Sequence, residues 1–205
     1  MRDNRILYSI FQYWHTRMHD KRLPARGQIF PAEIANLLPF LFLADVEGES
    51  SIRLRLIGTH IERLLGCDLT GCALDARDGF HAAFGVQRDF YDAAAQKLVI
   101  GSTHELYYDT ALETGIHDQR PADNIEPIML RYDRLILPLS RDGQRVDMLF
   151  GGLVAAQPRQ SVPHPDAEPI VFTEVARFCL AQPYIWPQQD RRAYVDFSHS
   201  RAALS

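Results

Sequence analysis

The stretch of residues 52–75 constrains the fold most, because a strand pattern runs directly into two short helical patterns. Its first residues alternate between apolar side chains and arginines, which predicts a strand with one buried face. The apolar positions of that strand are Ile52, Leu54 and Leu56. Gly58 ends the alternation, and Thr59 can cap a first short helix. A second short helical turn is predicted between Asp68 and Gly71.

Length and composition indicate one globular domain with extensions. The chain has 205 residues, which is too short for two comfortable domains. A net charge of −4 disfavours nucleic acid or an anionic membrane as partner, and no apolar run reaches the ~18 residues of a membrane span. The sequence begins without a signal-peptide pattern and contains three cysteines, so we expect reduced thiols and a cytoplasmic location.

An amphipathic helix is predicted for residues 4–19, because apolar side chains recur at intervals of three and four. The stripe consists of Leu7, Phe11, Trp14 and Met18. Two interpretations are open. The stripe can pack on its own domain, or it can form the contact of a homodimer, so residues 1–26 are expected to be a dimer or packing element.

The remaining patterns predict an α+β fold with five antiparallel strands and short helices on one face. The expected elements are a hairpin at 41–57, helices at 76–84 and 87–99, a strand at 102–109, a loop at 110–127 and a hairpin at 129–155. They belong to a core of residues 27–156. Residues 157–205 are expected to form a Pro-rich linker and a C-terminal extension, with a short helix at 171–180 followed by a loose tail.

Four segments carry a family resemblance through their order and spacing. The first is the Leu-Leu-Gly-x-Asp-Leu-Thr-Gly segment, which consists of Leu64, Leu65, Gly66, Asp68, Leu69, Thr70 and Gly71. The others lie at 31–39, 135–139 and 145–149. Together they resemble the PAS domain family, and most closely a bacterial subfamily in which a PAS fold forms nearly the whole protein. The resemblance implies a sheet that grips a small molecule under its helices.

The resemblance also implies a function. It suggests a cytoplasmic, stand-alone sensor or adaptor without catalytic activity, which passes its signal to a separate signalling protein. The pocket is expected to be mostly apolar, as small-molecule sites are. Its expected lining consists of Leu56, Phe84, Phe90, Tyr91, Ala94, Tyr107 and Tyr132. Arg134 could enter the pocket and bind a carboxylate or phosphate. The alternatives are core packing for the aromatic residues and a surface position for Arg134.

The sequence leaves the cofactor unknown, and haem and flavin are disfavoured. The flavin-reactive cysteine segment of light-sensing relatives is absent, and the helix predicted at 87–99 lacks the histidine of haem-binding relatives. His60 and His81 are the nearby haem candidates. His15 and His19 have the spacing of a metal pair, but no third ligand is near them in the sequence, so no metal site is expected.

Two other function classes stay open. One is a small hydrolase or isomerase that uses His104, Tyr107 or Asp109 for acid–base chemistry. The other is a ligand-free protein-interaction scaffold that uses the apolar stripe of the N-terminal helix. Acid–base residues in a cavity would support the enzyme only with matched geometry, and a cavity without two interacting ionisable groups would exclude it.

Overall fold

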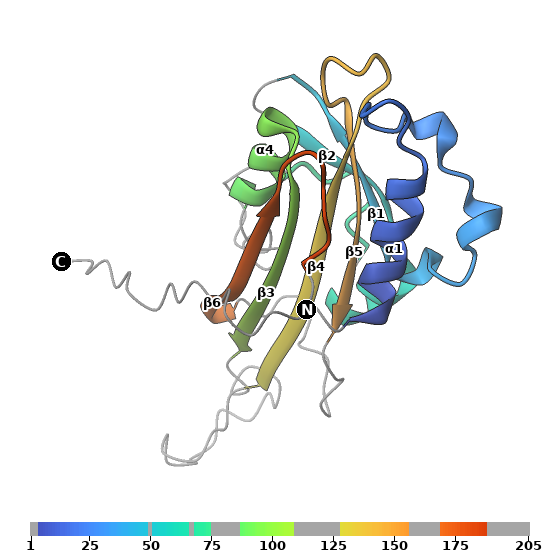
Figure 1. Cartoon of the computed structure of the whole chain (residues 1–205). Helices are drawn as coiled ribbons and strands as arrows, with labels where there is room; N and C mark the ends of the chain where they lie inside the picture. Colours follow the sequence, from blue (N-terminus) through green and yellow to red (C-terminus); the bar gives the residue numbers. More distant parts are fainter. Residues whose placement is uncertain are drawn as a thin grey trace, which may run out of the picture.

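The computed structural model describes residues 4–48, 51–65, 68–74, 87–108, 128–155 and 169–187. In these ranges one antiparallel sheet has the strand order β2-β1-β5-β4-β3-β6 (Figure 1). Its strands are β1 Leu41–Val46, β2 Ile52–Ile57, β3 Val99–Tyr108, β4 Ile128–Leu139, β5 Met148–Ala155 and β6 Pro169–Leu180. The helices are α1 Arg5–Thr16, α2 Thr59–Leu65 and α4 Gln87–Gln96, with 3-10 turns at Arg26–Gln28, Pro31–Ile34 and Leu38–Phe40.

The predicted α+β class with an antiparallel sheet is confirmed, but the prediction of five strands is wrong. The sixth strand, β6, is the segment predicted as a short helix at 171–180, and it pairs with β3 along nearly its whole length. A bulge at Val175 interrupts the regular pairing, because Thr103 faces Ala176 whereas His104 faces Glu174. The extra residue breaks the period of two, so the sequence lacks a clean strand pattern there.

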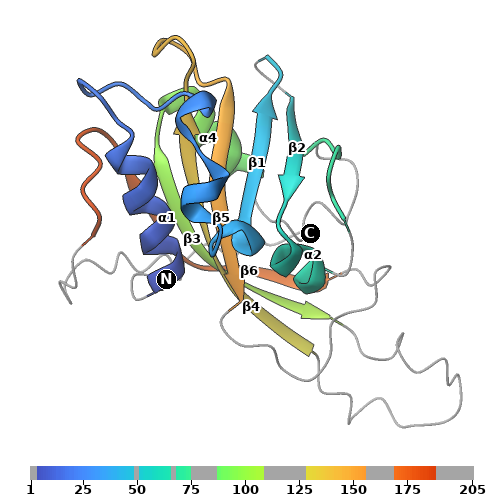
Figure 2. The ribbon, with the colours of Figure 1, turned by 90° about the vertical axis from the view of Figure 1, so that its right-hand side faces the viewer.

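Helix α1 covers one face of the sheet, and α4 covers the other (Figure 2). Asn4 caps α1, since its side-chain oxygen accepts hydrogen bonds from the backbone N–H groups of Ile6 and Leu7. The helix packs closely because Gly152 of β5 lies beneath it. A Cβ atom at that position would lie only 2.5 Å from the Ile10 side chain.

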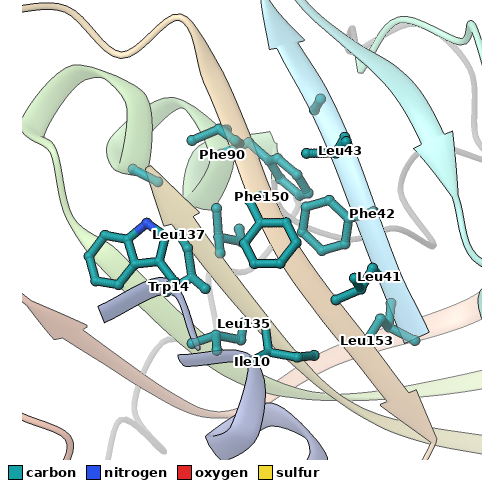
Figure 3. Close-up of a cluster of buried hydrophobic side chains, with 14 of the residues drawn as sticks. Ile10, Trp14, Leu41, Phe42, Leu43, Phe90, Leu135, Leu137, Phe150 and Leu153 are labelled. Carbon is teal, nitrogen blue, oxygen red and sulfur yellow. The ribbon is translucent and has the colours of Figure 1, made fainter. Parts of the chain in front are cut away.

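The core on the α1 face is apolar. Figure 3 shows Ile10 and Trp14 of α1 beside Leu135 and Leu137 of β4, and all four side chains are fully buried. The Trp14 indole N–H also donates a 2.9 Å hydrogen bond to the backbone carbonyl of Pro138. Burial of each such side chain contributes roughly 1.5–3 kcal/mol. The N-terminal helix is therefore part of the core of this chain.

Strand β2 differs from the prediction at its end. A bulge shifts its pairing with β1, because Leu43 faces Leu56 whereas Ala44 faces Leu54. After this shift Leu56 is exposed and Ile57 is buried. The prediction that Leu56 shares the buried face is therefore wrong, because one extra residue reverses the faces of the residues that follow.

The segment after α2 forms a turn in residues 68–71. The prediction of a short helix between Asp68 and Gly71 is therefore wrong. The Asp68 carboxylate accepts a 2.8 Å hydrogen bond from the Thr70 backbone N–H, and Gly71 has a positive φ of 87°. The chain then runs beside β2, where the N–H groups of Gly71 and Leu74 donate to backbone carbonyls of that strand. These bonds cover the edge of β2.

Residues 181–187 pack on the protein, contrary to the predicted loose tail. Tyr184 is buried, and its ring meets the Trp14 ring edge-on at 5.2 Å. The predicted helix at 76–84 and the predicted loop at 110–127 lie outside the described residues. Among the described helices, none has the length and apolar character that crossing a membrane requires.

Candidate functional site

Strands β3 and β4 present buried polar side chains to α4. Ser102 faces Arg134 across the two strands, and His104 faces Tyr132. All four side chains are fully buried. Alternate residues of a strand point to one face of a sheet, so both pairs lie on the same side. A protein core rarely contains so many polar groups, which makes this region the candidate site.

Helix α4 supplies the charge that balances Arg134. A nitrogen of the Arg134 guanidinium lies 2.6 Å from a carboxylate oxygen of Asp89, and both side chains are completely buried. The guanidinium also lies 5.2 Å from the centre of the Phe90 ring. Removal of one partner from such a buried ion pair leaves an uncompensated charge, which costs about 3–5 kcal/mol.

Strand β6 contributes a second arginine to the same carboxylate. Arg177 donates from Nε to the other oxygen of Asp89 at 2.7 Å and from Nη2 to Asp92 at 2.9 Å. Each oxygen of Asp89 is thus bound by a different arginine. The Arg177 side chain is 21% exposed, so this arginine forms the outer part of the cluster. We call the set of Asp89, Asp92, Ser102, His104, Arg134, Glu174 and Arg177 the charged cluster.

The bulge in β6 brings Glu174 and Arg177 to the same face. Residues three apart in a regular strand point to opposite faces, but the extra residue at Val175 changes this. Glu174 therefore faces His104, while Arg177 faces Ser102. The pKa of Glu174 is raised, first because the carboxyl is partly buried and then because the Asp89 carboxylate is near.

His104 is held in its neutral form. Its Nε2 lies 2.8 Å from the Ser102 hydroxyl and 3.2 Å from an Arg134 nitrogen. Burial lowers the pKa of His104 to about 2, and the positive charge of Arg134 contributes to the shift. Because Arg134 can only donate, Nε2 is an acceptor and the ring proton is assigned to Nδ1. This histidine stays uncharged at neutral pH.

Three side chains of the cluster have the geometry of a metal site. Ligand atoms of Asp89, His104 and Glu174 all lie within 4.8 Å of one another. Carboxylates and a neutral imidazole bind several divalent metals. Both oxygens of Asp89, however, already accept from Arg134 and Arg177. A metal ion would have to displace an arginine cation from Asp89, so the arrangement fits an ion-pair cluster better.

The structure brings together part of the predicted ligand site. Phe90, Tyr132 and Arg134 lie in the buried region under α4, and Tyr91 and Ala94 of the same helix are half-buried. Leu56 is exposed on β2 and does not join them. Phe84 and the side chain of Tyr107 lie outside the described part of the protein. The alternative of a surface position for Arg134 is wrong, because the side chain is fully buried, whereas its binding of a ligand stays a prediction.

Sequence reasoning missed Asp89, Asp92, Ser102, Glu174 and Arg177 as site residues. A signal for Asp89 existed, because it precedes Ala93 by four positions and so lies on the buried face of the helix. An acidic residue on that face requires a buried partner. Arg177 had no such signal, because its segment was predicted to be helical.

Other predicted residues lie elsewhere. Leu7, Phe11 and Trp14 are buried within their own chain, and Met18 is half-buried after the end of α1. In this conformation they face their own sheet, so a dimer contact through them would require α1 to exchange between copies.

His60 lies against Phe40 at 4.6 Å, and burial, followed by the charge of Arg63, lowers its pKa. The other haem candidate, His81, and the acid–base candidate Asp109 lie outside the described residues.

Comparison with protein families gives one finding. The model of the family described as PAS domain matches residues 2–154, about three quarters of the chain. The match therefore includes α1 and ends in β5, so that β6 and the residues after it lie beyond it. Searches of curated proteins and of solved structures give no significant match.

Proposed function

Since this chain belongs to the PAS domain family, we propose that it is a non-catalytic signalling sensor or adaptor that binds a small molecule, a partner protein or both. The family supports a sensor role in signalling in general. The site for a small molecule would lie on the α4 face of the sheet. This proposal includes the expected bacterial and cytoplasmic setting, and a separate signalling protein as the output partner.

The observation that carries the proposal is the charged cluster. A fold that needed only stability could fill this space with apolar side chains, because a buried ion pair often adds little net stability. Instead, Arg134 and Asp89 are fully buried beside Phe90 and Tyr132. Polar groups on an apolar background are the usual composition of a site that recognises a small molecule.

The alternative of a small hydrolase or isomerase has one supporting observation, the contact between His104 and Ser102. A general base should have a pKa near the working pH, whereas that of His104 is lowered to about 2. Both carboxylate oxygens of Asp89 are bound by arginines of the same chain. The cluster therefore favours binding over catalysis. A ligand-free scaffold that uses a homodimer contact is the second alternative.

Native mass spectrometry of the freshly purified full chain tests the proposal. We expect a mass above the 23.4 kDa polypeptide that disappears when the protein is denatured. The variant Tyr132→Phe/Ser102→Ala should lose this mass, because it removes two hydroxyl groups from the α4 face. The matched control Arg131→Met alters an exposed ion pair of β4 and should keep it.

Absence of any bound mass, also after incubation with a cell metabolite extract, would contradict the small-molecule part of the proposal. The adaptor part would then be tested by the oligomeric state and by cross-linking of the chain to a partner. Retention of the bound mass in the double variant would place the ligand somewhere other than the α4 face.

A further inference from the structure

One segment of the chain contacts both faces of the sheet. We call β6 together with residues 181–187 the C-terminal clasp. Two neighbouring residues of β6 show its double role. Arg177 binds carboxylates of α4 on one face, and Phe178 lies against Trp186 on the other face, with ring centres 5.7 Å apart. The family match ends before the clasp begins.

The clasp is attached to α4 by charge. Arg177 connects Asp89 with Asp92, so a single side chain joins two carboxylates of the helix to β6. Hydrogen bonds of this kind between charged groups are roughly twice as strong as neutral ones. Asp89 also binds Arg134, and the position of Arg177 is therefore linked to the buried part of the charged cluster.

The clasp holds α1 through aromatic contacts. The Trp186 ring lies 4.8 Å from the Phe11 ring and 5.4 Å from the Tyr8 ring. The buried Tyr184 ring lies against Trp14 at 5.2 Å, and its hydroxyl donates a 2.6 Å hydrogen bond to the backbone carbonyl of Lys97. The buried side chains of Phe11 and Trp14 thus contact residues of the clasp as well as the core of the protein.

We propose that the C-terminal clasp is a conformational switch. In its closed state it holds α1 on the sheet, and the ion pairs of Arg177 with Asp89 and Asp92 stabilise that state. When Arg177 leaves Asp89 and Asp92, β6 loses its attachment to α4 and keeps its pairing with β3. The strand and the aromatic cover of α1 then open together more readily. An anionic ligand group that competes for Arg177 would have this effect. The inference deepens the proposed function, because it connects the charged cluster with α1.

The coupling must act in both directions. If loss of the Arg177 contacts favours the open clasp, then loss of the Trp186 contacts must weaken the hold of Arg177 on α4 by the same factor. A structural arginine with no link to α1 would lack this reciprocity. The two substitutions therefore distinguish a clasp from two separate local contacts.

The variant Arg177→Met tests whether the ion pairs of Arg177 keep the clasp closed in the full-length protein without any ligand. We expect amide hydrogen exchange in α1 to increase about tenfold, because local opening governs exchange and the lost ion pairs stabilise the closed state. The two tryptophans of the chain, Trp14 and Trp186, both lie at the clasp, so their fluorescence should shift to longer wavelength. Arg55→Met is the matched control, since Arg55 has an exposed ion pair with Asp45 near the opposite edge of the sheet.

The variant Trp186→Ala tests reciprocity. Exchange in α4 should increase, although the ring contacts of Trp186 are with α1 and β6 on the other face of the sheet. In the double variant the two effects on exchange should be non-additive by more than about twofold, since independent sites add within that limit. An Arg177→Met protein that is folded and has unchanged exchange in α1 overturns the proposal.

The unaltered protein supplies a test that does not depend on how the variants fold. In denaturant-dependent exchange, α1 and β6 should open together, with the same dependence on denaturant. Exchange of α1 while β6 stays protected overturns the proposal. Because no ligand is added, these results are independent of the mass-spectrometric test, and either proposal can fail alone.

Discussion

The two faces of the sheet consist of the same strands, but different interactions connect each face to its helix. On the α1 face, β4 presents Leu135 and Leu137 to apolar side chains of the helix. On the α4 face, the residue between Asp133 and Leu135 is Arg134, which pairs with a buried carboxylate. Apolar packing tolerates small changes of volume, whereas a buried charge requires its partner. Both faces therefore stabilise the fold, but the α4 face does so only while its buried charges stay paired.

The largest expected effect is the loss of the central carboxylate. Asp89→Ala removes the acceptor shared by Arg134 and Arg177, and it leaves a fully buried guanidinium without that charge. We expect a loss of about 4 kcal/mol in the free energy of unfolding, measured by urea denaturation. Asp45→Ala, which alters a partly exposed pair, should cost less than about 1 kcal/mol. Equal effects of the two substitutions would refute the assigned importance of Asp89.

Truncation of an apolar side chain on the α1 face should lower the free energy of unfolding somewhat less than Asp89→Ala does. Ile10→Ala removes a fully buried side chain between α1 and the sheet, and we expect a loss of about 3 kcal/mol in urea denaturation. Gln12→Ala on the exposed side of α1 is the control and should stay within about 0.5 kcal/mol. A small effect of Ile10→Ala would show that α1 is detached from the sheet in solution.

Low pH should reduce the free energy of unfolding through His104 on the α4 face. Its pKa is lowered from 6.5 to about 2 in the folded protein, so the unfolded chain binds an extra proton between these values. Stability then rises with pH in this window, and about 2–3 kcal/mol should be lost between pH 6.5 and 4.5. The raised pKa of Glu174 acts in the opposite direction, and Asp89 and Arg134 also face this histidine.

The variant His104→Gln isolates the contribution of His104 to this pH dependence. Its unfolding free energy should depend less steeply on pH than that of the parent protein between pH 6.5 and 4.5. The control Gln12→Ala, which alters a non-titrating exposed residue of α1, should leave the slope unchanged. If the unfolding free energy of His104→Gln depends on pH as steeply as that of the parent protein, other groups cause the pH dependence.

The smallest expected effect is at the start of α1. Asn4→Ala removes the acceptor for the backbone N–H groups of Ile6 and Leu7, which should cost about 1 kcal/mol. Asn4→Ser keeps a capping oxygen and should recover most of the loss in thermal denaturation. No recovery would indicate that the contact of the Asn4 amide with Asp133 carries the effect instead.

Some proposals remain predictions that further measurements must decide. These are the homodimer contact of Leu7, Phe11, Trp14 and Met18, and the division of the chain at residues 26 and 156. Measurement of the oligomeric state of the full chain by sedimentation would test the first. If α1 exchanges between copies, the dimer should dissociate slowly, because the helix must leave its own core.

By itself the sequence determined the elements with local signals. The strand at 52–57, the apolar stripe of α1 with its Asn4 cap and the hairpin around residues 129–155 were all predictable, because each depends on a repeat within a few residues. The order and spacing of the PAS-like segments also sufficed to identify the family. These features depend little on contacts between distant residues.

Tertiary structure alone decided the two bulges, the sixth strand and the charged cluster. A bulge reverses the faces of a strand without leaving a mark in composition, so Leu56 was misplaced and Glu174 and Arg177 were not recognised as neighbours. The partner of Arg134 is 45 residues away on a helix, and that of Arg177 is 88 residues away. Long-range pairing of charges depends on how the elements pack, and no periodicity within a segment contains that information.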